Sequence, residues 1–499
     1  MRLGIYALFL ALLVALLWKA PEVVLWGKLH SLAVVAVLAA STIAIFQLNH
    51  REKAKKNGSV FLIFGGLAFQ IWGVVMVRRF AEMEIVPDEF HFLIIPFAFA
   101  PMVHSVLLGQ RAGVFSSVFG SLFGCLVMPM ADRWVFLAMS LFCGLVAVLA
   151  TGHVRRRAKL LRAGLWVGVA AVVLDVMFGK IAIAGLQEWN PQAWQHFGRV
   201  CLLALGVGIF TGLIVGGLLP VLEAFFGLTT EISWLELGDM NHPLLKRLQL
   251  EAPGTFHHSL IVAALAESAA EAIGADALQC RASAYFHDIG KLAKPEYFIE
   301  NQNGENPHDQ LTPTMSALII IAHVKDGVDL AIKNKLNPKI LEVIQEHHGD
   351  SLVYYFYRKA QEKAAADAEK EGKGEIAGDD LPQIGEKSFR YPGPVPQSRE
   401  SGIISLADAI ESASRTVKKP SPARIQALID EIVFKRVREG QLDDTGLTLN
   451  ELSTVRKSFA KTLRSTMHSR IEYPKEPGTE EMPREAGKAE AKAVETVKG

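Results

Sequence analysis

Residues 286–292 read Phe286-His287-Asp288-Ile289-Gly290-Lys291-Leu292, a run in which a histidine is followed directly by an aspartate. An imidazole can hold one divalent ion, and a carboxylate has two oxygens with which it can bridge two ions. A single His-Asp pair is weak by itself, but seven of the chain's 15 histidines fall between His257 and His348. This clustering predicts a metal site and a fold that gathers those histidines around the pair.

The segments on either side of this run predict a series of helices. Thr312-Pro313 and Asn337-Pro338 each provide a helix cap followed by the proline that favours the first helical position. Gly349 favours a helix end directly after His347 and His348, and two neighbouring histidines can both ligate only near such an end. Helices are expected over about 256–273 and 276–288, from 312, from 337 to 349, from a cap at Ser401, and over about 421–438 and 448–470.

The candidate metal ligands lie at the ends or on the inner faces of five of these helices. They are His258, His287, Asp288, His323, His347, His348 and Asp408. Five imidazoles and two carboxylates suit two divalent ions that share Asp288, with Fe or Mn preferred, Zn possible and Mg disfavoured by imidazole. His257 remains the alternative to its neighbour His258.

A pair of ions in this setting predicts hydrolysis of a phosphodiester by a hydroxide bound to both metals. The ions would hold the hydroxide and the phosphate oxygens in line, and their net positive charge would attract the anion. Lys291 follows the His-Asp pair by one turn and is expected to hold a phosphate oxygen as a point charge. Asp288 and Lys291 are therefore the predicted catalytic residues.

The first 225 residues hold most of the apolar content of a chain that is 50% hydrophobic, which predicts a membrane half before a charged half. A span needs about 20 mostly apolar residues. Because Trp18-Lys19-Ala20-Pro21 is a poor cleavage site, the first apolar stretch is expected to remain as an anchor. Eight stretches qualify, at about 3–18, 31–48, 59–77, 91–109, 112–130, 134–151, 163–185 and 198–222.

Basic loops predict the orientation of these spans. Lysine and arginine gather at 51–56, after the second span, and at 155–162, after the sixth, and short loops of this kind stay in the cytoplasm. Eight spans then place both termini and the charged half in the cytoplasm. The net charge of +1 says nothing about partners, and no block of lysine and arginine is long enough to suggest a nucleic-acid polymer.

Ionisable residues inside the expected spans are costly in lipid, and three occur, namely His104, Asp175 and Lys180. They are interpreted either as hydrogen-bonding groups between helices, with Lys180 reaching toward the interface, or as part of a sensor for a ligand or ion. The last span is also rich in glycine, which favours close helix packing. These glycines are Gly206, Gly208, Gly212, Gly216 and Gly217.

The expected fold class is all-α, a polytopic transmembrane helix bundle followed by a cytoplasmic all-helical domain. The expected boundaries are an anchor and short external loop over 1–30, seven transmembrane helices over 31–226, the helical domain over 227–470 and a disordered tail over 471–499. Residues 359–387 are interpreted as a solvated helical extension and flexible insertion.

The chain resembles the HD-domain phosphohydrolases, and more closely the seven-transmembrane HD family (7TMR-HD), the PgpH-type cyclic-di-AMP phosphodiesterases of bacteria. The resemblance implies a di-metal site, commonly of iron or manganese, in a protein of the bacterial inner membrane that hydrolyses cyclic di-AMP to linear pApA. All seven ligand positions named above match the family pattern. The matching segments are 252–259, 287–291, 306–309, 316–320, 323–327, 347–349, 391–394 and 406–408.

Two departures from the family pattern stand out. Only residues of about 19–30 occupy the place of the usual large extracellular domain, and Asp350 stands where threonine commonly follows His-His-Gly. The expected partners are a cyclic dinucleotide and the lipid bilayer, with a homodimer as a further possibility. The alternatives are an HD hydrolase of another cyclic dinucleotide or nucleotide, and a non-catalytic membrane receptor that only binds nucleotide.

Overall fold

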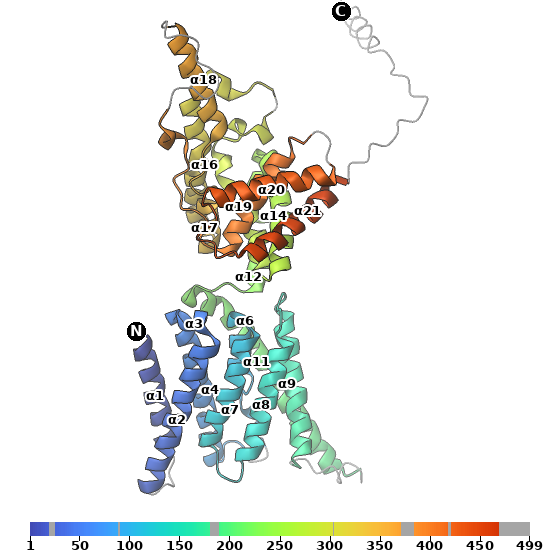
Figure 1. Cartoon of the computed structure of the whole chain (residues 1–499). Coiled ribbons are helices and arrows are strands. Elements are labelled where there is room, and N and C mark those ends of the chain that lie inside the picture. The colour runs from blue at the N-terminus through green and yellow to red at the C-terminus, as the bar shows by residue number, and fades with distance from the viewer. Residues whose placement is uncertain are drawn as a thin grey trace, which may run out of the picture. The chain divides into compact units, whose positions relative to one another are not determined.

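The computed structural model describes residues 1–18, 25–87, 90–179, 189–302, 304–370, 384–417 and 421–468. In this part of the chain the regular structure is helical, and one β-bridge pairs Leu352 with Arg390. The chain divides into two compact units, Met1–Asp239 and Met240–Gly499, and each has its own hydrophobic core (Figure 1). The expected all-α class is confirmed.

Unit 1 (Met1–Asp239) consists of long apolar helices that lie side by side (Figure 1). Six stretches are long and apolar enough to cross a membrane: Leu32–Asn49, Asn57–Glu82, His91–Leu108, Arg133–Ala150, Ala158–Met177 and Pro191–Phe226. The chain is therefore a membrane protein. The helices of this unit are α1 (Arg2–Trp18), α2 (Leu25–Asn49), α3 (Arg51–Ala54), α4 (Asn57–Glu82), α5 (His91–Ile94), α6 (Phe99–Leu108), α7 (Gln110–Val127), α8 (Arg133–Ala150), α9 (Ala158–Met177), α11 (Pro191–Phe226) and α12 (Glu231–Leu237).

The eight expected spans correspond to helices, with three differences. The apolar helix α1 is too short to count among the six, and α7 is not among them either; its sequence begins with Gln110 and Arg111 and includes the buried serines Ser116 and Ser121. The fourth span is interrupted between α5 and α6 at Pro96, whose nitrogen cannot donate a helical hydrogen bond. Lys180 lies outside the described residues.

His104 is buried and joins helices within unit 1. Its Nε2 lies 3.0 Å from the carbonyl oxygen of Leu62, and its Nδ1 bonds to the hydroxyl of Ser116. A Cβ on Gly66 would come within 2.3 Å of the same ring, so this glycine makes room for it. These contacts support the interpretation of His104 as a hydrogen-bonding group between helices. Asp175 is likewise buried, in α9.

The prediction that glycine serves close helix packing holds where α9 crosses α11. A Cβ on Gly208 would lie 2.2 Å from the carbonyl oxygen of Gly164, and a Cβ on Gly212 would lie 2.4 Å from that of Leu160. By contrast, a Cβ on Gly206 meets nothing within 4 Å. The packing role therefore belongs to one face of α11.

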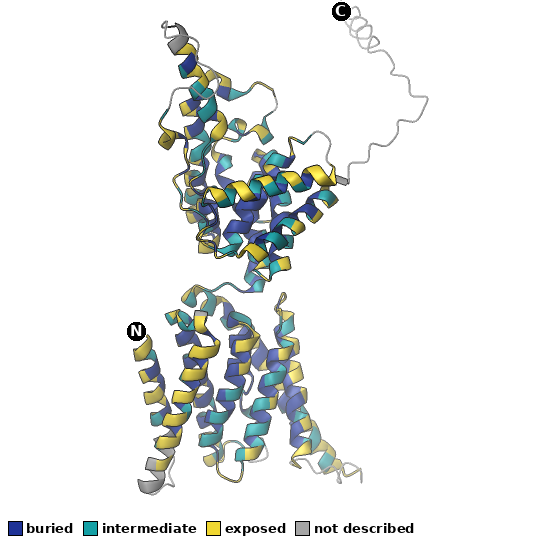
Figure 2. Ribbon diagram, in the orientation of Figure 1, coloured by how far each residue is buried: buried dark blue, intermediate teal, exposed yellow. Residues whose placement is uncertain are grey.

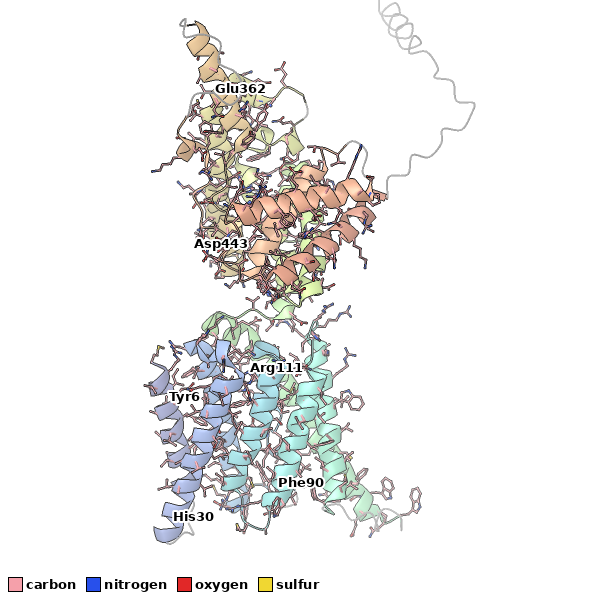
Figure 3. All side chains as sticks on the ribbon, in the orientation of Figure 1. Tyr6, His30, Phe90, Arg111, Glu362 and Asp443 are labelled. Atoms are coloured by element: carbon pink, nitrogen blue, oxygen red, sulfur yellow. The ribbon has the colours of Figure 1, made fainter. Side chains whose placement is uncertain are left out.

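The two ends of unit 1 carry different loops. Figure 3 labels Tyr6 and Arg111 toward one end of the unit, and His30 and Phe90 toward the other. The basic loops after α2 and α8 share the first end, because Lys53 and His153 line the same cavity. This agrees with the alternation expected of successive spans.

In unit 2 (Met240–Gly499) the helices pack around α14, which lies against α15, α19 and α21. Buried residues gather on the inner faces of these helices (Figure 2). The helices are α13 (Pro243–Glu251), α14 (Pro253–Ile273), α15 (Ala277–Phe286), α16 (Pro313–Lys333), α17 (Pro338–Glu346), α18 (Tyr354–Lys370), α19 (Arg399–Ser414), α20 (Pro422–Arg438) and α21 (Leu449–His468), with the 3₁₀ helices η1 (Ile289–Ala293), η2 (Pro295–Tyr297), η3 (Ile299–Asn301), η4 (Pro307–Gln310) and η6 (Glu386–Phe389).

Local capping explains where these helices begin. The side chains of Thr312 and Asn337 accept hydrogen bonds from the first turns of α16 and α17, as their sequences predicted. The prediction that Ser401 caps α19 is wrong, because Ser398 takes that position and accepts a hydrogen bond from the backbone nitrogen of Ser401. Ser401 is instead buried within the first turn.

The expected solvated extension begins as α18, which runs to Lys370. Residues 371–383 and 469–499 lie outside the described residues. The flexible insertion and the disordered tail therefore stay predictions.

Candidate metal centre

Asp288 lies at the junction between α15 and η1. The helix α15 ends at Phe286, two residues earlier than the sequence suggested. His287 is the C-cap of α15, and Asp288 is the N-cap of η1. Gly290 then lets η1 lie directly on α16, since a Cβ there would be 1.8 Å from the carbonyl oxygen of His323. The glycine thus brings Asp288 and His323 to the same place.

The structure brings all seven predicted ligands together in two groups. Within each group the potential ligand atoms lie within 4.8 Å of one another, and nearly all of the residues are buried. One group is Asp288, His323, His347 and His348, and the other is His258, His287 and Asp408. Side chains from distant parts of the chain therefore converge.

Asp288 faces both groups, with one oxygen toward each. Its Oδ1 is 3.4 Å from Nε2 of His323 and 3.7 Å from Nε2 of His347. Its Oδ2 is 3.3 Å from Nε2 of His287 and 3.5 Å from Nε2 of His258. This is the arrangement in which one carboxylate can bridge two ions.

Asp408 on α19 closes the far side of the centre. Its Oδ1 is 3.0 Å from Nε2 of His258, and its Oδ2 is 3.7 Å from Nδ1 of His348. The second carboxylate therefore also faces a member of each group.

Backbone carbonyls orient three of the imidazoles. The Nδ1 of His287 donates to the carbonyl oxygen of Ala284 at 2.7 Å, and that of His347 donates to the carbonyl of Ile344 at 2.9 Å. His323 makes the same contact with the residue three positions before it. Because a carbonyl only accepts, the proton resides on Nδ1 and the lone pair of Nε2 points into the centre, as a metal ligand requires.

His258 is oriented differently, by a side chain. Its Nδ1 donates to Oε2 of Glu411, a buried glutamate on the same helix as Asp408. A carboxylate partner makes an imidazole a stronger electron donor than a carbonyl does. His257 is exposed, so His258 is the neighbour that points inward.

The donor set fits divalent metal ions. The Nε2 atoms of His258 and His287 and the Oδ1 of Asp288 are buried and accept no hydrogen bond from the described residues. Leaving such atoms unsatisfied costs free energy, which coordination to a cation would recover. The cluster of imidazole and carboxylate groups can thus bind a divalent metal.

Burial and mutual attraction set the charges in the centre. Burial alone would raise the pKa of Asp288, but Lys291 and His287 outweigh it and hold that pKa well below its usual range. Burial would likewise raise the pKa of Asp408, yet His258 and His287 hold it low. Both carboxylates are therefore ionised and able to ligate.

The imidazoles divide into two kinds. Burial lowers the pKa of His323 to about 4, and burial together with His347 lowers that of His348, so both are neutral ligands. Burial opposes the protonation of His287, but Asp288 overcomes it and raises its pKa to about 10. A dication at this position would displace that proton, since metal and proton compete for the same lone pair.

Lys291 makes two ion pairs. Its Nζ is 2.7 Å from Oδ2 of Asp288 and 2.7 Å from Oε1 of Glu300. The hydroxyl of Thr255 donates to the same oxygen of Glu300 at 3.0 Å and so holds the Glu300 carboxylate beside Lys291. Lys291 therefore holds the Asp288 carboxylate in place, a contact that the sequence did not predict.

Sequence reasoning missed Glu411, Glu300 and Tyr391. Tyr391 stacks on His348 with ring centroids 4.3 Å apart. Glu411 follows Asp408 by three residues, so helical spacing places both on one face, and this signal was available. The contacts of Glu300 and Tyr391 depend on how loops return to the centre, which residue spacing does not specify.

Comparisons with known proteins agree with this arrangement. Residues 25–230 match the family described as 7TM receptor with intracellular HD hydrolase, and residues 255–413 match the HD domain. The chain is 35% identical over 451 residues to the cyclic-di-AMP phosphodiesterase PgpH of Bacillus subtilis (strain 168), a match that covers 89% of this chain and 59% of that protein. It is 32% identical over 447 residues to PgpH of Listeria monocytogenes serotype 1/2a (strain 10403S), covering 89% and 58%.

The chain thus spans less than two thirds of the length of these relatives. The crystal structure of the L. monocytogenes PgpH HD domain in complex with cyclic di-AMP is 40% identical to the matching part. That match covers 46% of this chain and 99% of the solved one, with a TM-score of 0.41.

Proposed function

The chain belongs to the family of 7TM receptors with an intracellular HD hydrolase, and on that premise we propose that it hydrolyses cyclic di-AMP to linear pApA. Two relatives that match 89% of the chain are named cyclic-di-AMP phosphodiesterases. A related HD domain has been solved in complex with cyclic di-AMP. These similarities support a phosphodiesterase. Among the candidate substrates they favour cyclic di-AMP.

The observation that carries the proposal is the position of Asp288 between two groups of ligands. Its two oxygens face different histidines, and Asp408 repeats this on the opposite side. The mixed nitrogen and oxygen donors favour two divalent ions of iron or manganese. When bound, such ions supply the Lewis acidity that activates water at neutral pH and offsets the charge of a phosphodiester.

The chain's own residues prepare this centre. Lys291 keeps the Asp288 carboxylate ionised and fixed, while Glu300 balances the charge of the lysine. Glu411 holds the ring of His258. Asp288 and Lys291 are thus proposed as catalytic, and the seven residues of the two groups as metal ligands.

The side of the membrane is also proposed. The basic loops after α2 and α8 favour the cytoplasm, and α11 ends at Phe226 before the chain enters unit 2. We therefore assign residues 31–226 to the membrane domain and 227–470 to a cytoplasmic HD domain. A cysteine introduced at exposed Asp309 should resist a membrane-impermeant maleimide in intact cells and react after lysis.

Turnover of purified full-length protein tests the proposed reaction. With Mn²⁺ or Fe²⁺ present, cyclic di-AMP should give pApA, and cyclic di-GMP and cyclic mononucleotides should react more slowly. Faster turnover of another dinucleotide would overturn the substrate assignment. Binding of cyclic di-AMP without any product would instead indicate a non-catalytic receptor.

A further inference from the structure

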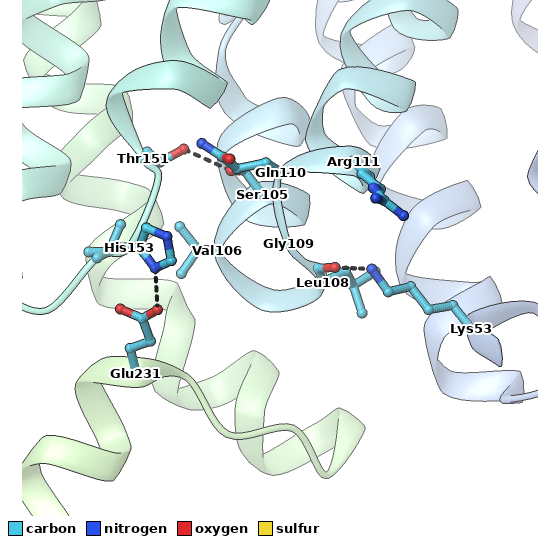
Figure 4. A pocket seen from close by; sticks show the side chains of 11 residues that line it. Lys53, Ser105, Val106, Leu108, Gly109, Gln110, Arg111, Thr151, His153 and Glu231 are labelled. Atoms are coloured by element: carbon cyan, nitrogen blue, oxygen red, sulfur yellow. Dashed lines mark hydrogen bonds and ion pairs between the residues drawn. The ribbon is translucent and has the colours of Figure 1, made fainter. Parts of the chain in front are cut away.

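A separate cavity of about 390 Å³ opens at the end of unit 1 that carries the basic loops (Figure 4). All of its walls belong to unit 1, and it contains none of the proposed metal ligands. Its lining comes from α3, the end of α6, the start of α7, the loop after α8 and the start of α12. Nothing in the proposed hydrolysis uses it.

One side of the cavity is positively charged. Lys53 is half-buried there, and its ammonium group donates to the carbonyl oxygen of Leu108. Arg111 lines the same side, and Figure 4 shows both residues on one side of Gly109. An ammonium group has three donors, so the contact with Leu108 leaves two of them for a ligand.

The two cations are close enough to repel each other. Burial lowers the pKa of Lys53, and the neighbouring charge of Arg111 lowers it further. Two like charges held in a partly buried site are stabilised by an anion between them. An anion bound between Lys53 and Arg111 would therefore lower the electrostatic energy of the site.

The backbone at this side also presents donors. The helix α7 begins after Gly109, which has φ +89° and gives no side-chain cap. The first backbone N–H groups of a helix have no partner within it, and the helix dipole favours negative charge at that end. Gln110 and Arg111 are the first residues of α7, and both line the cavity.

The other side of the cavity is closed by a contact between His153 and Glu231. His153, which has a strained φ of +51°, places its Nδ1 3.0 Å from Oε1 of Glu231. Oε1 of this carboxylate is thus paired with His153, whereas Oε2 is buried without a hydrogen bond from the described residues and lies 3.9 Å from Nε of Arg155. Figure 4 shows Glu231 next to His153, on the side of Gly109 away from Lys53 and Arg111. An anion is consequently directed to the Lys53 and Arg111 side.

We propose that this cavity binds an anionic phosphate group between Lys53, Arg111 and the start of α7. Arginine and lysine, together with helix N-terminal amides, are the groups that proteins use for phosphate. The position at the end of the membrane bundle makes the headgroup of an anionic phospholipid one source and a free phosphate the other. This site goes beyond the proposed hydrolysis and does not depend on it.

Thermal unfolding of the full-length protein tests the proposal. The protein is placed in nanodiscs of phosphatidylglycerol or of phosphatidylcholine, and the second preparation is also titrated with inorganic phosphate. At least one anionic source should raise the unfolding temperature of wild type. The Lys53→Gln, Arg111→Gln double variant should have an apparent affinity for that source that is lower by about tenfold or more. The matched control is Arg51→Gln with Arg162→Gln, two exposed basic residues outside the lining, which should respond as wild type does.

The outcomes distinguish the sources. Stabilisation by phosphatidylglycerol alone that the double variant loses identifies a lipid headgroup, and stabilisation by inorganic phosphate alone identifies a soluble ligand. Phosphate bound at the metal centre would stabilise wild type and the Lys53→Gln, Arg111→Gln variant equally. If wild type and the double variant respond identically to both probes, the proposal is wrong. Should the double variant fail to fold, Arg111→Gln alone decides, because that side chain is exposed.

Discussion

Asp288 lies at the middle of the proposed centre, because its two oxygens lie 3.3 to 3.7 Å from the Nε2 atoms of four histidines. In the proposed centre, replacing it would remove a ligand from each ion at once. The five histidines and Asp408 would then have to hold two dications without the carboxylate between them. For this reason a single substitution at Asp288 is expected to affect both ions.

Asp288→Ala is predicted to lower the metal content from about two ions per chain to less than one and to abolish hydrolysis. Elemental analysis of protein purified without oxygen measures the first effect, and product formation the second. Asp309→Ala, an exposed aspartate in η4, is the control and should keep both. A variant at Asp288 that retains full metal content and turnover would refute the ligand assignment.

Glu411→Gln tests the carboxylate behind His258. Glutamine keeps the shape but loses the charge that strengthens the imidazole as a donor, so metal affinity should fall about 10- to 100-fold. Competition with a chelator measures this affinity without reference to activity. Glu431→Gln, on an exposed position of α20, should leave it unchanged. Equal affinities in the two variants would show that Glu411 has no part in positioning His258.

Among the elements, the contact between η1 and α16 determines whether the two halves of the ligand set meet. Gly290 approaches the carbonyl of His323 so closely that no side chain fits between them. The sequence predicts a helix over about 276–288 and places Gly290 just after its end. The role of Gly290 as a point of close approach becomes visible only when the two elements are packed.

Gly290→Ala should therefore displace η1 from α16 and separate Asp288 from His323. Overpacking of this kind typically costs about 1–3 kcal/mol of folding free energy. Chemical denaturation should show that loss, together with a lower metal content. Gly385→Ala, where a Cβ meets nothing within 4 Å, should change neither. Normal stability and metal content in Gly290→Ala would contradict the close packing.

Helix positions in unit 2 were predictable because their signals are local. Thr312-Pro313 and Asn337-Pro338 each pair a capping side chain with a proline, and the structure starts α16 and α17 there. Ser398 and Ser401 carry the same local signal three residues apart, so the sequence alone did not distinguish them. The true cap depends on which serine has its backbone outside the helix.

The gathering of the seven proposed ligands could be predicted from residue type and spacing, while the contacts around them could not. A helix end beside a histidine pair or an inward aspartate can be identified without knowing the fold. The partners Glu300 and Tyr391 reach the centre from loops, and their contacts with Lys291 and His348 depend on tertiary packing. In unit 1 the apolar stretches were found, but the interruption around Pro96 was not, because the stretch is apolar on both sides of it.

For the molecule as a whole, the chain combines a membrane unit with a helical unit whose buried histidines and aspartates could bind metal ions. The membrane unit carries a basic cavity at the end that bears its cytoplasmic loops, as proposed. The second unit holds its ligands by buried contacts within its own core. Metal binding should therefore be a property of the folded chain and should stabilise it against unfolding.

The number of ions bound per folded chain tests the central claim most directly. Full-length protein purified without oxygen, stripped of metal and reloaded with Mn²⁺ or Fe²⁺, should bind about two ions with high affinity. Elemental analysis after removal of free metal gives this number. Two ions per chain is the predicted result, and a folded chain that binds none or only one at saturation would contradict the account.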